Sequence, residues 1–308
     1  MLDLISPLRY QHQALYLDSN YRLTRGSMAR FTALASHLRP GRGTFTAVVE
    51  PARQAPAPIA QVMYPLGARA ARITFLLPAA AAQSPDLAEL TEGLAWQAAS
   101  WGALQLLAEL PEDNPAFETF RRAGFSVYAR QRIWKWPSVR DSSGQPRCWK
   151  LASPEDEQAV RSLYQALVPP LVQSAEPFVT RRLPPLIYRQ QGELLASVEP
   201  YFGARGIYLL PLVHPALGNP GELLADLPNI LQPILGRPIY LAVRSYQAWL
   251  ENILEEQGAT VAPELALLVK HLAVSQRAAQ LNPAYAGLKN HGAEPTTSIV
   301  QNIEGKDS

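Results

Sequence analysis

The segment NPAFETFRRAGFSVYARQR, residues 114–132, holds the pattern that decides the fold. Asn114-Pro opens a short helix that ends at Gly124. A long strand is predicted over residues 125–136, and an apolar strand over residues 103–110 precedes the segment. A strand, a short helix and a second strand therefore follow one another here.

The residues before this segment predict three strands and a longer helix. Residues 43–50, 58–64 and 72–77 carry β-branched and aromatic residues between turn signals, which is typical of strands. Ser84-Pro-Asp then opens a helix, since serine is a good cap and proline suits the first turn. Leucines at helical spacing give this helix an apolar stripe.

The second half of the chain repeats this order. Its predicted strands cover residues 148–152, 193–198, 206–213, 238–243 and 259–274, and its predicted helices cover residues 153–167, 222–235 and 246–257. The repeat indicates an internal duplication. We therefore predict two domains, residues 1–140 and 141–275, followed by a tail over residues 276–308 that is poorly ordered or docked.

Composition limits the classes of function. The 308 residues carry 28 Lys and Arg against 26 Asp and Glu, a net charge of +2 that is too even to favour nucleic acid or an anionic membrane as partner. The one cysteine, Cys148, excludes an intramolecular disulfide and a cysteine-pair zinc site, and we expect it to be a small buried hydrophobe. No metal site is predicted. The chain begins without a signal peptide and its longest apolar stretch, residues 73–82, is too short to cross a bilayer, so we expect a cytoplasmic protein.

Residues 114–132 resemble the C-terminal motif of the GNAT superfamily of N-acyltransferases, in which an Asn after the fifth strand is followed by a short helix and Gly-Phe. A looser version, RSYQAWLENILEEQGAT, stands at residues 244–260. The resemblance covers residues 43–136 and 148–274. It implies an α/β (α+β) fold of two GNAT-like domains, each a splayed mixed β-sheet flanked by helices. Acetyl-coenzyme A would lie in the split between the fourth and fifth strands of a domain, with its pyrophosphate on backbone N–H groups at the start of the next helix.

The phosphate-binding loops of both halves depart from that family's glycine-rich pattern. The first loop reads PAAAAQSPD over residues 78–86, without a glycine, and Asp86 would repel a pyrophosphate. The second loop reads HPALGNPGE over residues 214–222 and holds two glycines. If either half binds acetyl-coenzyme A, we therefore expect the second half to do so. The residues expected to bind it are Val213, Leu217, Gly218, Asn219 and Gly221, together with Asn114 from the motif of the first half.

The residues for acid and base catalysis also depart from the family. Its proton donor is a tyrosine four residues before the motif glycine, and the matching positions here hold Phe120 and Leu254, which cannot donate a proton. Neither fourth strand carries a Glu as general base. His214, at a strand end, is a candidate base acting through water, or else a structural histidine before a proline. Tyr246 is a candidate replacement acid, or else a helix-entry tyrosine packed on the sheet edge.

Two hypotheses of function stay open at this point. The resemblance favours the first, an N-acyltransferase that moves an acetyl group from acetyl-coenzyme A to an amine-bearing small molecule or peptide. The second is a non-catalytic tandem protein that kept the fold as a binding or assembly scaffold, with a protein partner or a second copy of the chain. Because the family's acid and base are replaced, we expect little or no acetyl transfer.

Overall fold

The structure of the protein is a computed structural model that describes residues 14–26, 43–48, 58–65, 67–84, 86–137, 148–179, 183–231 and 237–272. We call residues 14–137 the first half and residues 148–272 the second half. The predicted tail lies outside the described residues, and the domain division between residues 140 and 141 stays a prediction. Within the described ranges, none of the helices has the length and apolar character that crossing a membrane requires.

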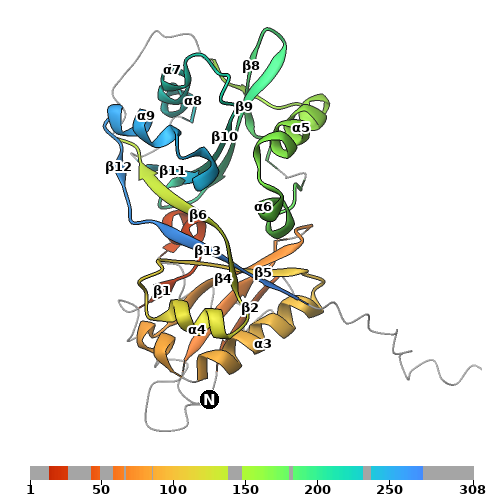
Figure 1. Ribbon diagram of the computed structural model, residues 1–308, viewed down its shortest axis with the longest axis vertical. Coiled ribbons are helices and arrows are strands. Elements are labelled where there is room, and N and C mark those ends of the chain that lie inside the picture. Colours follow the sequence, from red (N-terminus) through yellow and green to blue (C-terminus); the bar gives the residue numbers. More distant parts are fainter. Residues whose placement is uncertain are drawn as a thin grey trace, which may run out of the picture. The chain divides into compact units, whose positions relative to one another are not determined.

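One mixed sheet runs through both halves (Figure 1). Its strands in the described residues are β1 (Leu15–Tyr16), β2 (Thr44–Val48), β3 (Ile59–Met63), β4 (Ala70–Leu77), β5 (Gln105–Leu110), β6 (Ser126–Lys135), β7 (Lys150–Leu151), β8 (Leu186–Gln190), β9 (Glu193–Phe202), β10 (Ile207–Val213), β11 (Ile239–Arg244), β12 (Thr260–Val261) and β13 (Leu265–His271). The strand order is β2-β3-β4-β5-β13-β6-β11-β10-β9-β8-β7, with β1 paired to β4 and β12 paired to β6. The sheet is mixed, as the resemblance implied.

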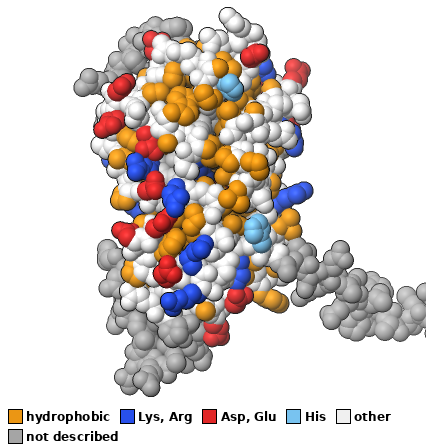
Figure 2. Space-filling model, in the orientation of Figure 1, with side chains coloured by type: hydrophobic (Ala, Val, Ile, Leu, Met, Phe, Trp, Pro, Cys, Tyr) orange, Lys and Arg blue, Asp and Glu red, His pale blue; other side chains and the backbone are white. Residues whose placement is uncertain are grey.

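Helices flank this sheet. They are α1 (Ser19–Thr24), α3 (Asp86–Ser100), α4 (Ala116–Arg122), α5 (Glu157–Leu167), α6 (Pro170–Ala175), α7 (Pro220–Ala225), α8 (Leu227–Leu231) and α9 (Leu250–Glu256), with short 3-10 turns at Ala79–Gln83, Pro154–Asp156 and Ser245–Gln247. Leucines of α3 and Phe120 of α4 belong to the core of the first half. Leucines of α7, α8 and α9 belong to the core of the second half. On the face shown in Figure 2, basic and acidic side chains lie among one another, as the even composition suggests.

Most predicted elements are present, and proline explains two of the differences. The strand predicted over residues 259–274 consists of β12 and β13, with Pro263 between them, because proline has no N–H for the ladder. The helix predicted over residues 222–235 is divided into α7 and α8, with Pro228 in α8. Four elements were not predicted from the sequence: β1, α1, and α6 and β8 in the proline-rich passage after α5.

The expectation of a buried cysteine is wrong. Cys148 is exposed, whereas its neighbour Trp149 is only 4% exposed. The Trp149 indole N–H donates a hydrogen bond of 2.8 Å to the carbonyl oxygen of Leu223, so the larger side chain takes the place in the core. Side chains alternate along an extended segment, and burying one of these two neighbours therefore exposes the other.

The two halves exchange their last strands. β13 of the second half lies between β5 and β6 of the first, where Leu268 is opposite Ala108 on one side and Val127 on the other. β6 of the first half in turn pairs with β11 of the second half, with Ala242 opposite Ile133. Each half therefore closes its sheet with a strand from the other. The exchanged strands also reach into the cores, since Leu268 packs in the first core and Trp134 in the second.

This exchange leads us to expect that the two halves unfold together. Leu268 is fully buried, so Leu268→Ala should lower the free energy of unfolding by about 2–5 kcal/mol. Val261→Ala is the matched control, because Val261 is 49% exposed on β12 and should cost little. Urea unfolding followed by near-ultraviolet circular dichroism and tryptophan fluorescence measures both variants. Two separate transitions, of which Leu268→Ala shifts only one, would contradict the expectation.

Candidate functional site

A parallel pair of strands splits apart in each half. β4 pairs with β5 only from Ala70–Gln105 to Arg72–Leu107, although both strands continue beyond these residues. β10 pairs with β11 only from Ile207–Ile239 to Leu209–Leu241, and both again continue. The splay between the fourth and fifth strands that the resemblance implied is therefore present twice. We call the two gaps the first split and the second split.

The chain's own N-terminal segment fills the first split. In β1, Leu15 lies opposite Leu76 and Tyr16 opposite Phe75, both on β4. The next residue, Leu17, donates its N–H to the carbonyl oxygen of Thr74 on β4 at 2.9 Å. Its own carbonyl oxygen accepts the N–H of Glu109 on β5, also at 2.9 Å. Leu17 is 1% exposed. A short strand thus bridges the two sides of this split through its backbone.

A side chain fills the second split. Gln247 lies in the 3-10 turn after β11 and is 2% exposed. Its Oε1 accepts the N–H of Val213 at 2.7 Å, and its Nε2 donates to the carbonyl oxygen of Pro211 at 2.9 Å. Both backbone groups belong to β10. Val213, a residue expected to bind cofactor, therefore already has a hydrogen-bond acceptor for its N–H within the protein.

The loop after β10 brings the other predicted cofactor residues of the second half together. His214 opens the loop as a turn residue: its Nδ1 accepts the N–H of Ala216 at 3.1 Å, and its carbonyl oxygen accepts the N–H of Leu217 at 3.0 Å. Gly218 and Asn219 are exposed, while Leu217 is buried. Gly221 lies in α7, where its carbonyl oxygen accepts Nε2 of Gln257 at 2.5 Å.

The remaining predicted site residues lie apart from this loop. Asn114 lies just before α4, where its Oδ1 accepts the N–H of Ala116, the first residue of the helix, at 2.9 Å. Phe120 packs edge-to-face on Phe125, with ring centroids 5.1 Å apart, and is 1% exposed. Leu254 is fully buried. Tyr246 packs against an apolar cluster on α6, β5, β6 and β13. Asp86 begins α3, and its side chain is outside the described part of the chain.

A largely buried ion cluster, which the sequence did not predict, is formed by Arg72, Glu109, Tyr128, Glu176 and Arg244. Glu176, just after α6, is at its centre. Its Oε2 lies 2.6 Å from Arg72 Nη2, and its Oε1 lies 2.9 Å from Arg244 Nη2. The Tyr128 hydroxyl donates to the same Oε1. Arg72 Nη1 also reaches Glu109 Oε1 at 3.4 Å. The cluster therefore joins β4 of the first half to β11 of the second.

The two carboxyl groups of the cluster have opposite pKa shifts. Burial raises the pKa of Glu176, but Arg244, Arg72 and the Tyr128 hydroxyl outweigh burial and hold that pKa at about 2. Burial raises the pKa of Glu109, and Asp18 adds to this effect while Arg72 opposes it.

Tyr246, the candidate acid, lies within the field of this cluster. Burial raises the pKa of its hydroxyl to about 12, since the opposing effect of Arg244 is smaller. A phenol with so high a pKa stays protonated at neutral pH. In the residues that the structure describes, no group of three or more His, Cys, Asp or Glu side chains is placed to hold a metal ion.

Comparisons with known proteins concern the fold. No protein-family model matches the chain, and no curated protein sequence matches it. Among solved structures, the chain is similar to a tandem GNAT protein from the clavulanic acid biosynthesis pathway, at 14% identity and a TM-score of 0.46, over 86% of this chain and 95% of that chain. It is also similar to a GCN5-related N-acetyltransferase from Sphaerobacter thermophilus, at 12% identity and a TM-score of 0.47, over 84% and 96%. A third similar structure is a GCN5-related N-acetyltransferase from Kribbella flavida, at 14% identity and a TM-score of 0.47, over 78% and 95%.

The ion cluster gives the protein an acid-sensitive stability. The pKa of Glu176 in the folded protein is about 2, below its ordinary value of 4.5, so its stabilising contribution is present above pH 4.5 and is lost as the pH falls toward 2. Glu176→Gln leaves the buried guanidinium group of Arg244 without its carboxylate and removes one of the two carboxylate partners of Arg72, so it should lower the free energy of unfolding at pH 7 by about 3–5 kcal/mol. The difference from the unaltered protein should shrink between pH 4.5 and pH 2.

Urea unfolding at pH 7 and at pH 3 measures this effect. Glu256→Gln on the exposed end of α9 is the matched control and should change stability little at either pH. An equal loss of stability for Glu176→Gln at pH 7 and at pH 3 would mean that its charge does not stabilise the fold.

Proposed function

We propose that the protein is a non-catalytic binding or assembly protein built on a splayed GNAT-like sheet. The observation that carries this proposal is that the chain's own groups occupy both splits. In the family that the sequence resembles, acetyl-coenzyme A lies in such a split. The first split holds backbone from residues 15–17, and the second holds the Gln247 amide.

The residues present in the first split do not fit acetyl-coenzyme A. A cofactor arm there would have to displace Leu17 from its hydrogen bonds with Thr74 and Glu109. Exposing a fully buried leucine costs about 1.5–3 kcal/mol before those hydrogen bonds are counted. Ser19 also holds the segment in place, since its N–H donates to Glu109 Oε2 at 3.0 Å. These contacts support a closed first split.

The second split is closed by a smaller group. An incoming amide would have to replace Gln247 at both Pro211 and Val213, and a displaced Gln247 would lose two buried hydrogen bonds. Leaving a buried polar group unsatisfied costs about 1–3 kcal/mol. The apolar side chains of Phe120 and Leu254 at the family's acid positions further support a non-catalytic role.

An acetyl-coenzyme A-dependent N-acyltransferase acting in the second half is the second candidate. The observation that favours it is that one side chain, not a strand, closes the second split. Gly218 and Asn219 are exposed in the loop at the end of that split, where backbone N–H groups would meet a pyrophosphate. Its acceptor would be an amine-bearing small molecule or peptide.

Calorimetric titration with acetyl-coenzyme A separates the two candidates. We expect no detectable binding to the unaltered protein at about 1 mM ligand, a concentration that reveals a binding free energy as weak as about −4.1 kcal/mol. Gln247→Ala removes the amide from the second split and is the variant in which weak binding should first appear. Gln190→Ala, at an exposed end of β8, is the matched control and should behave as the unaltered protein. Micromolar binding to the unaltered protein, with acetylation of amines, would establish the second candidate instead.

A further inference from the structure

Three exposed arginines gather where the end of α1 meets the turn between β9 and β10. Arg22 and Arg25 are three residues apart, a spacing that brings side chains together on a helix surface. Arg205 lies in the turn, and its N–H donates to the carbonyl oxygen of Thr24 at 3.1 Å. Its side chain lies over Gly26, since a Cβ atom added there would be 2.7 Å from Arg205 Nη1. We call the surface formed by the three arginines the arginine patch.

Further basic and polar groups border the arginine patch. Arg237 comes just before β11, and its Nη1 donates to the carbonyl oxygen of Gly203, in the turn between β9 and β10, at 2.8 Å. The Tyr240 ring lies in the same region, because a Cβ atom added to Gly206 would be 2.9 Å from its Cε2. Exposed Lys135 of β6 is opposite Tyr240, and residues directly opposite in paired strands point to the same face. Arginine and tyrosine are enriched where proteins bind one another.

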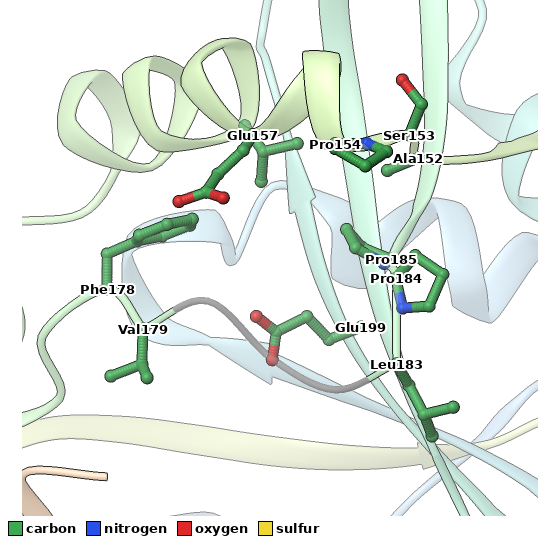
Figure 3. Close-up of a pocket in the computed structure, with 11 residues that line it drawn as sticks. Ala152, Ser153, Pro154, Glu157, Phe178, Val179, Leu183, Pro184, Pro185 and Glu199 are labelled. Atoms are coloured by element: carbon green, nitrogen blue, oxygen red, sulfur yellow. The ribbon is translucent and has the colours of Figure 1, made fainter. Parts of the chain in front are cut away.

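The acidic side chains on the same segments have other partners. Asp18 is 6% exposed at the opposite end of α1, where its Oδ1 accepts the N–H of Tyr21 at 2.8 Å. Glu199, which precedes the turn on β9, lines a pocket together with Leu183 (Figure 3). Its Oε2 accepts the Tyr201 hydroxyl at 3.0 Å. Both carboxylates are therefore directed into contacts of their own.

The arginine patch has a positive field that the chain around it does not balance. Of the ion pairs formed inside the part of the chain that the structure describes, none includes Arg22, Arg25 or Arg205. The adjoining sequence segments, residues 27–42 and 232–236, contain three more arginines and no Asp or Glu. Carbonyl groups at the C-terminal end of α1 offset part of the repulsion among the cations. An anionic partner would offset the rest.

We propose that the arginine patch binds an acidic segment of a partner protein, whose carboxylates pair with Arg22, Arg25 and Arg205. The planar guanidinium group matches a carboxylate, which it can bind through two parallel hydrogen bonds. A protein segment is favoured over nucleic acid, because the basic groups are confined to one patch of a chain whose net charge is only +2. The inference rests on the proposed function, since it names the class of partner that the binding or assembly protein would take.

Fluorescence anisotropy of the full chain with a labelled peptide of alternating glutamate and serine tests the patch. The same peptide with glutamine in place of glutamate is the neutral probe. We expect the glutamate peptide to bind at least about tenfold more tightly than the neutral probe, and to bind more weakly as salt is added. Arg22→Gln, Arg25→Gln and Arg205→Gln should each weaken its binding by about two- to fivefold, as is typical of exposed ion pairs, and the three combined by about tenfold or more.

The matched control combines Arg69→Gln, Arg121→Gln and Arg122→Gln, which removes the same charge from exposed positions of the first half. This control should bind the glutamate peptide as the unaltered protein does, and thermal unfolding checks that each variant is folded. An equal loss of affinity in the control would show that net charge alone attracts the peptide, and would overturn the proposal. Equal binding of the neutral probe, or tighter binding of single-stranded DNA of the same net charge, would also overturn it.

A second measurement separates the patch from the proposed function. The glutamate peptide carries its label at the C-terminus, so its N-terminal amine is free to be acetylated. It is incubated with the protein and acetyl-coenzyme A and examined by mass spectrometry. Binding together with an acetylated peptide would keep the patch and refute the non-catalytic proposal, whereas binding without a product supports both. Absence of both binding and product would overturn the patch alone.

Discussion

Where two parallel strands separate inside a protein, the backbone N–H and C=O groups along the gap still need partners, because a buried polar group without one is costly. This requirement arises twice here, between β4 and β5 and between β10 and β11. The chain meets it with its own groups, the backbone of Leu17 in the first split and the side chain of Gln247 in the second. The splayed sheet can therefore be stable without a bound cofactor.

Contacts next to the first split also join the two halves. The segment that fills the first split continues into α1, whose Thr24 carbonyl oxygen accepts the N–H of Arg205 at 3.1 Å in the turn between β9 and β10. Gly203 permits this approach, because a Cβ atom there would lie 2.3 Å from that carbonyl oxygen. Glu176 then links Arg72 beside the first split to Arg244 at the end of β11. Together with the exchange of β6 and β13, these contacts hold the two halves together. The segment that closes the first split is therefore also part of the contact between the halves.

The sequence predicted the elements better than their partners. Periodicity and turn residues located β2 to β6 and the repeat in the second half, since those signals are local. A two-residue strand such as β1 is too short to show a period, and no local signal indicates that β13 inserts between β5 and β6. Arg72 resembles an ordinary polar residue in a strand, because its partner Glu176 is 104 positions away in the chain. His214 and Tyr246 each have a structural interpretation beside a functional one in the sequence, and their observed contacts are a turn and an apolar packing site.

Native-state hydrogen exchange of the backbone amides of Leu17, Glu109 and Val213 tests most directly whether the splits are closed. Their N–H groups bond across the gaps, so we expect them to exchange only in rare openings, at rates that acetyl-coenzyme A does not change. The exposed turn residue Gly192 should exchange quickly and serves as the reference. Fast exchange at Leu17, Glu109 and Val213 that becomes slow when acetyl-coenzyme A is added would show open splits that the cofactor fills, and would contradict this account.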